Sequence, residues 1–324
     1  MTRPSLFTTP APSVAVQIAP RLVSAIAIAR HGGTSVISAH AMEALPAGAV
    51  APALNGQNIA DRRVVSQALT RILGLLGGRP RRVALVVPDN IAKVSLVRLD
   101  SVPPRAQDLD QLIRWHVRKS APFPVEEAQV TYSRGAVSPE GGQEFVVALA
   151  RRQVVEEYEA VCTEAGAHAG IVGLATFSLV NAVLGAEGSP AGDWLLVHIT
   201  PDYGSIVILR GRDLIFFRNR AEGSEESLPD LVHQTAMYYE DRLGGTGFAR
   251  VVVTGSGGEG WNLAPTPTTF DAIRGQIDTR LGVRTETVDP QRIARFSDRI
   301  AADPSLLNMV APLVGALAGA GAGV

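Results

Sequence analysis

A pattern of three short apolar segments occurs twice in this chain, and it constrains the fold more than any other feature. The first set covers residues 14–18, 24–30 and 35–41, and the second covers residues 194–199, 205–210 and 213–218. Turn residues separate the segments within each set, and β-branched residues are frequent in them, which is typical of consecutive strands. A helical pattern follows both sets. The repetition therefore predicts two similar α/β halves that arose by internal duplication.

A helix is predicted after Asp61, because aspartate is a frequent N-cap and apolar residues recur behind it at spacings of three and four. These residues are Val64, Val65, Ala68, Leu69, Ile72 and Leu76. Gly77 and Gly78 provide a common C-terminal stop. A continuous apolar strand is predicted at residues 83–87. The first half thus continues from its opening strands into a helix and a buried strand.

The segment 108–132 predicts an amphipathic helix that ends at an aromatic residue between two prolines. The apolar face of this helix contains Leu109, Leu112, Ile113, His116 and Val117. Pro122 and Pro124 lack the backbone N–H that a helix needs, so the helix ends before Phe123. From residue 93 to residue 173 the order is strand, helix, strand, strand, helix, strand, which predicts a compact split-βαβ subdomain.

Composition excludes several classes of function. The net charge is −1 and no block of like charges occurs, which argues against nucleic-acid binding through charge. Cys162 is the single cysteine, and its place on the apolar side of a predicted helix indicates a core residue. The six histidines do not occur at metal-ligand spacing, and no motif of a serine hydrolase, zinc protease or P-loop protein is present. We therefore expect no metal site and no catalytic residues.

Neither end of the sequence predicts a membrane anchor. Residues 1–13 are polar and contain prolines but no apolar stretch typical of a signal peptide, so a flexible N-terminus is expected. Residues 308–324 are apolar, but Pro312 and several glycines interrupt them, and they are shorter than the roughly 20 residues that cross a bilayer. A buried terminal helix with a glycine-rich end is expected there.

In their order, these segments resemble the PilM family, the actin-like proteins of type IV pilus and type II secretion inner-membrane platforms. The resemblance rests on the helix and proline turn at 108–132, the residue pair 45–46, the strand and helix at 144–166, and the sequence at 216–220. It implies an α/β, actin-like (ribonuclease-H-like) fold of duplicated domains with an inserted split-βαβ subdomain. The implied divisions are a flexible N-terminus at 1–13, a first half at 14–92 with 174–190 and 305–324, an inserted βαββαβ subdomain at 93–173, and a second half at 193–304.

The resemblance also implies a nucleotide cleft between the halves, but the residues there depart from the family pattern. In relatives, an aspartate and glycines in the first and second hairpins hold the phosphates and magnesium. Here Gln17 stands at the first aspartate position, and His198 and Thr200 replace the acid and the glycine of the second hairpin. The implied nucleotide-binding candidates are Gln17, Asp202, Gly204, Gly255, Gly257 and Gly258. Because glutamine cannot supply charge to magnesium, the expectation is a pseudo-ATPase that binds ATP and magnesium weakly or not at all.

The family's partner is a PilN-like bitopic membrane protein, whose cytoplasmic N-terminal peptide lies in the groove between the first half and the inserted subdomain. Pro122, Phe123 and Pro124 are the candidates near that groove, with a core position favoured for Phe123. The resemblance implies a cytoplasmic scaffold peripheral to the inner membrane, which contacts the membrane through its partner and meets other platform components. Two alternatives stay open: an active actin-like ATPase that uses Asp202 for magnesium, and a filament-forming structural protein of the same fold.

Overall fold

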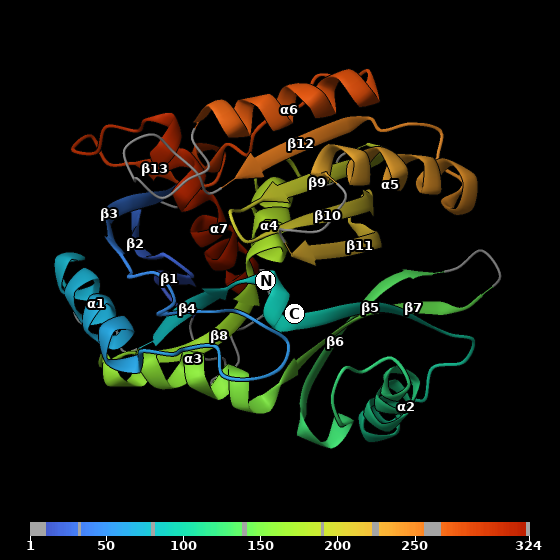
Figure 1. Ribbon diagram of the computed structural model, residues 1–324, viewed down its shortest axis with the longest axis horizontal. Coiled ribbons are helices and arrows are strands. Elements are labelled where there is room, and N and C mark those ends of the chain that lie inside the picture. The colour runs from blue at the N-terminus through green and yellow to red at the C-terminus, as the bar shows by residue number, and fades with distance from the viewer. Residues whose placement is uncertain are drawn as a thin grey trace.

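The computed structural model describes residues 11–31, 34–78, 82–137, 141–188, 191–221, 227–255 and 267–321. Over these segments the chain forms a six-stranded, a four-stranded and a three-stranded sheet, with helices packed on their faces (Figure 1). The fold class is α/β, as the sequence predicted. Gly257 and Gly258, two of the predicted nucleotide-binding residues, lie outside the described residues.

The six-stranded sheet forms the first half. Its strands are β1 (Val14–Ala19), β2 (Leu22–His31), β3 (Thr34–Ala44), β4 (Arg82–Val87), β8 (His168–Leu174) and β13 (Arg295–Phe296). They are arranged in the order β13-β3-β2-β1-β4-β8. One face is covered by α1 (Arg62–Leu75) and α3 (Arg152–Glu164), and the other by α7 (Pro304–Gly321).

The residues of β1 alternate between two apolar cores. Val14, Val16 and Ile18 belong to the core beneath α1 and α3, whereas Ala15 belongs to the core beneath α7. Successive side chains of a strand point to opposite faces, so a strand covered on both sides is largely apolar, and Gln17 near the end of β1 is the polar exception. The N-terminus of α1 is as predicted, because the Asp61 carboxylate accepts a hydrogen bond from the Val64 N–H over 3.0 Å.

The four-stranded sheet forms the second half. Its strands are β9 (Asp193–Ile199), β10 (Tyr203–Arg210), β11 (Asp213–Ala221) and β12 (Arg250–Gly255), in the order β11-β10-β9-β12. One face is covered by α5 (Leu228–Leu243) and α6 (Pro267–Leu281). The other face packs on α4 (Ala175–Glu187), which lies between the two halves (Figure 1).

Both halves have the same topology, which confirms the predicted duplication. In the first half, β1 pairs antiparallel with β2 and parallel with β4. In the second half, β9 pairs antiparallel with β10 and parallel with β12. The strands β1 and β9 are therefore equivalent, and the turns that follow them face each other across the gap between the halves.

The three-stranded sheet and one helix form the inserted subdomain. Its strands are β5 (Ala92–Leu99), β6 (Ala128–Val137) and β7 (Gln143–Arg151), which pair antiparallel in the order β5-β7-β6. The helix α2 (Ala106–Arg118) buries Leu109, Ile113 and Val117 against this sheet. His116, predicted on the apolar face, is exposed instead, because the buried stripe of α2 is only one residue wide per turn.

The inserted subdomain is smaller than the predicted 93–173 block. The elements follow one another as expected, but α3 packs in the core of the first half and β8 pairs in parallel with β4. Chain order alone does not separate a βαββαβ unit from a βαββ unit followed by a return to the first sheet. By pairing with β4, strand β8 covers an edge of the first sheet that would otherwise be open. Beyond α6 (Pro267–Leu281), Glu286 forms an isolated parallel bridge with Val252.

The terminal helix α7 is buried, as expected. Its apolar residues pack against the first sheet and α4, and Pro312 lies inside it. Cys162 is buried in the core of the first half, which confirms the prediction that it is a core residue. Over the described part of the chain, no helix combines the length and the apolar composition that crossing a bilayer requires.

Candidate functional site

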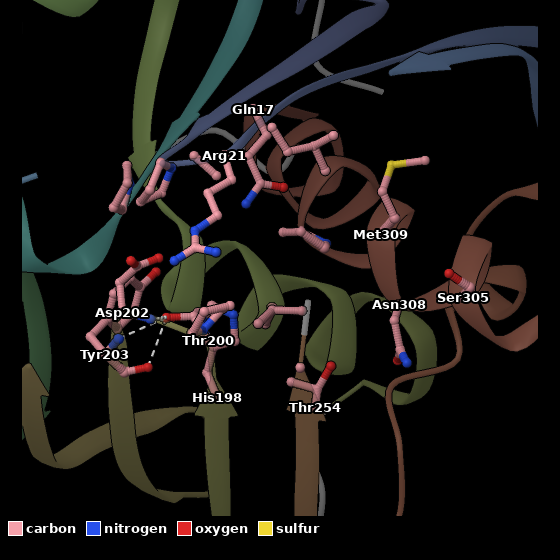
Figure 2. A pocket seen from close by; sticks show the side chains of 18 residues that line it. Gln17, Arg21, His198, Thr200, Asp202, Tyr203, Thr254, Ser305, Asn308 and Met309 are labelled. Carbon is pink, nitrogen blue, oxygen red and sulfur yellow. Dashed lines mark hydrogen bonds between the residues drawn. The ribbon is translucent and has the colours of Figure 1, made fainter. Parts of the chain in front are cut away.

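A cleft lies between the two halves, beyond the carboxyl ends of β1 and β9 (Figure 2). Four parts of the chain supply most of its lining: the β1–β2 turn at 19–22, the β9–β10 loop at 200–203, the end of β12 at 254–255, and the first turns of α7. Ligands of α/β proteins commonly bind beyond the carboxyl ends of the central strands. This cleft is therefore the candidate ligand site of the fold.

The charged groups of the cleft are few. Gln17, at the predicted acid position, directs a neutral amide into it, and Arg21 extends from the β1–β2 turn toward the opposite loop (Figure 2). Asp202, on that loop, is half-buried, and burial raises the pKa of its carboxyl while the charge of Arg21 opposes the rise. Among the described residues that line the cleft, Asp202 is the one carboxylate.

The Thr200 side chain closes the β9–β10 loop on itself. Its Oγ1 accepts hydrogen bonds from the backbone N–H of Tyr203 (2.9 Å) and of Asp202 (3.3 Å), and its hydroxyl donates to the Tyr203 carbonyl (2.8 Å). Glycine at this position would leave those amides free to face a ligand. Thr200 therefore uses backbone donors that a phosphate would otherwise need.

Two of the glycines predicted to bind nucleotide, Gly255 and Gly204, pack closely against neighbouring groups. Gly255, at the end of β12, lines the cleft, and a Cβ there would lie 2.8 Å from the Phe270 ring and 3.0 Å from the Ile199 carbonyl oxygen. Gly204 lies in β10 outside the cleft lining, where a Cβ would lie 2.8 Å from Leu228 Cδ1. Close packing against neighbouring side chains is thus sufficient to explain glycine at both positions.

His198 is buried, with its Nδ1 2.8 Å from the Thr176 hydroxyl and 3.6 Å from Asp89 Oδ2. Its burial and its polar partners are those of a structural imidazole. The sequence interpretation missed Asp89 and Arg21. The sequence does carry a signal for Asp89, because it comes two residues after the apolar strand β4, at the carboxyl end where ligands of α/β sheets bind.

The proline turn lies in the inserted subdomain, not in this cleft. Phe123 is buried in the core of the subdomain at 9% exposure, whereas Pro122 and Pro124 on either side of it are exposed. The favoured core position of Phe123 is therefore confirmed. No group of three or more His, Cys, Asp or Glu side chains that could hold a metal ion occurs in the described segments.

Comparison with known protein families identifies the chain. The family described as "Type IV pilus assembly protein PilM" matches residues 15–242, more than half of the sequence. The chain belongs to the PilM family.

A structural match to a pilus protein covers nearly all of the chain. A chain of the solved PilM-PilN type IV pilus biogenesis complex aligns with a TM-score of 0.77 at 16% identity, covering 97% of this chain and 98% of that one. The fold is thus actin-like, with the duplicated halves that the sequence predicted.

Two further solved structures align less well. The ethanolamine utilization protein EutJ from Carboxydothermus hydrogenoformans aligns with a TM-score of 0.48 at 9% identity, covering 96% of this chain and 90% of that one. The cytoplasmic domain of EpsL, an inner-membrane component of the type II secretion system of Vibrio cholerae, aligns with a TM-score of 0.46 at 11% identity. This match covers 82% of this chain and 94% of that one. At these TM-scores neither match adds to the PilM assignment.

Proposed function

We propose that this chain is a cytoplasmic scaffold of a type IV pilus assembly platform, and that it binds the cytoplasmic N-terminal peptide of a PilN-like membrane protein. The observation that carries this proposal is membership of the PilM family, together with the match over 97% of the chain to a chain of the PilM-PilN complex. Binding to this peptide holds the scaffold at the inner membrane, where it meets the other components of the platform.

We place the peptide site between the first half and the inserted subdomain, where the family resemblance puts it. An extended peptide gains affinity from main-chain hydrogen bonds and specificity from side-chain pockets, so it needs a rigid wall. The proline turn supplies such a wall, because Phe123 anchors it in the core while Pro122 and Pro124 stay exposed.

Calorimetric titration tests the peptide role. The purified chain is titrated with the N-terminal peptide of the PilN-like protein of the same pilus system, and a scrambled peptide serves as the control. We expect saturable one-to-one binding that weakens in the Pro122→Ala/Pro124→Ala variant and not in Pro104→Ala, an exposed proline of the same subdomain. Absence of binding to the wild-type chain would refute the scaffold role in this form.

We further propose that the cleft does not turn over ATP. Magnesium is held by carboxylates and other oxygen ligands, and the described cleft lining supplies a single carboxylate, from Asp202. Gln17 is neutral, and Thr200 uses the loop amides. The residues present therefore fit a magnesium–phosphate group poorly.

One alternative function is also supported by an observation: an actin-like ATPase with a rearranged second loop. Asp202 favours it, because this carboxylate does line the cleft. ATP hydrolysis by the purified chain that is abolished in Asp202→Ala would establish this alternative. Hydrolysis that persists in Asp202→Ala would indicate a contaminating enzyme.

A further inference from the structure

A buried polar network centred on Asp89 joins the two halves behind the cleft. Asp89 follows β4 in the short helix η1 (Asp89–Ile91) and is 0% exposed. Neither it nor its partners Thr176 and Ser205 line the cleft, whereas His198 and Tyr203, on the far side of the network, do. The network is thus separate from the candidate ligand site but in contact with its wall.

The Asp89 carboxylate accepts hydrogen bonds from both sides of the interdomain boundary. Its Oδ1 accepts the Thr176 backbone N–H at 2.9 Å, and its Oδ2 accepts the Thr176 hydroxyl and the Ser205 hydroxyl, the latter at 2.7 Å. Asn219 of β11 in turn donates to Ser205 Oγ at 2.9 Å. A carboxylate from the first half is therefore fastened to β10 and β11 of the second.

The network also fixes the cleft wall. The Thr176 hydroxyl has one proton and donates it to Asp89, so its oxygen accepts from His198 Nδ1–H, 2.8 Å away. The His198 ring stands edge-on to Tyr203, with centroids 5.8 Å apart. Asp89 therefore reaches the β9–β10 loop through Thr176 and His198.

The position of Asp89 suits a buried carboxylate. Thr176 lies in the first turn of α4, where backbone N–H groups lack partners within the helix, and the residue before the helix, Leu174, supplies no side-chain cap. Negative charge is favoured at such a helix start. Asp89 caps α4 from another part of the chain, and α4 is the segment that connects the first half to the second.

We propose that the Asp89 network is a latch that sets the angle between the halves and holds the cleft wall in place without any bound ligand. Hydrogen bonds to a charged group are about twice as strong as neutral ones, so the carboxylate charge carries the latch. Opening the cleft would separate Asp89 from Ser205. The latch does not depend on whether the cleft binds nucleotide or the groove binds peptide.

Distance measurement between spin labels on the two halves tests this latch in the full chain. Leu75→Cys in α1 and Met237→Cys in α5 are suitable sites, because these side chains are 72% and 51% exposed. Cys162 will not be labelled, since it is buried and burial raises the pKa of its thiol to about 12. Circular dichroism confirms that each variant remains folded.

In the labelled chain we expect one narrow distance distribution. Asp89→Asn should broaden it and move it to longer distances, whereas Asp100→Asn, at a carboxylate 95% exposed, should not. Ser205→Ala deletes the partner from the second half and should broaden the distribution in the same direction, with exposed Ser133→Ala as its control.

An unchanged distribution in folded Asp89→Asn would overturn the latch. If that variant does not fold, Ser205→Ala decides alone, and an unchanged distribution there would equally overturn it.

Discussion

Gly315 of α7 lies directly against the backbone of α4, so close that a Cβ on it would be 1.8 Å from the Ser178 carbonyl oxygen. One turn further along α7, a Cβ on Gly319 would meet the Asn181 amide at 2.4 Å. The two helices thus approach through glycine at successive turns. Because α4 connects the halves and α7 covers the first sheet, this crossing fixes one side of the cleft.

Replacement of Gly315 by alanine should destabilise the chain. The methyl group has no space, so the helices must separate, and overpacking of this kind costs about 1–3 kcal/mol or more. Gly275→Ala is the matched control, because Gly275 lies within α6 with no atom within 4 Å of an added Cβ. The control should be neutral or stabilising by about 0.5–1 kcal/mol. Urea unfolding measures both, and equal effects would contradict the close crossing.

Replacement of Phe123 by alanine should lower stability by about 3–5 kcal/mol, as is usual for a buried aromatic side chain. Phe123 packs in the core of the inserted subdomain with residues such as Leu109 and Ile113. Pro122→Ala changes an exposed neighbour and should stay near the wild-type stability. A Phe123→Ala variant of wild-type stability that no longer binds peptide would instead assign this side chain to the groove.

Asp193 should contribute stability in a pH-dependent manner. The Arg210 guanidinium, which binds it at 2.8 Å, and the Tyr239 hydroxyl hold the pKa of the Asp193 carboxyl below its usual range. A carboxyl whose pKa is lower in the folded than in the unfolded state stabilises the folded chain. This contribution is complete above the unfolded-state pKa of about 4, and it is lost as the pH falls through the folded-state pKa. Asp193→Asn should therefore be less stable than wild type at neutral pH, with a difference that shrinks at acid pH. A difference that does not change with pH would exclude this linkage.

Cys162 should be unreactive in the native chain. Burial, with a smaller contribution from the Glu159 charge, raises the pKa of its thiol to about 12. Since the thiolate is the reactive form, a disulfide reagent at pH 8 should modify it only after unfolding. Rapid modification of the folded chain would mean that the core around α3 opens.

The duplicated halves were predictable because each repeats a local signal, three short strands and then a helix. The boundary of the inserted subdomain was not, since whether β8 joins β7 or β4 depends on long-range pairing that leaves no mark in the order of elements. The neutral residue at Gln17 was visible in the sequence. Asp89 was missed, because its partners Thr176 and Ser205 lie 87 and 116 residues away and only the fold brings them together.

A calorimetric titration of the purified chain with ATP, with and without magnesium, tests directly whether the cleft is a working nucleotide site. Gln17 is neutral, and Asp202 is the only carboxylate among the described cleft residues. Magnesium should therefore not enhance binding, and ATP should bind weakly or not at all. Tight binding that requires magnesium would contradict this account and would make the cleft a working nucleotide site.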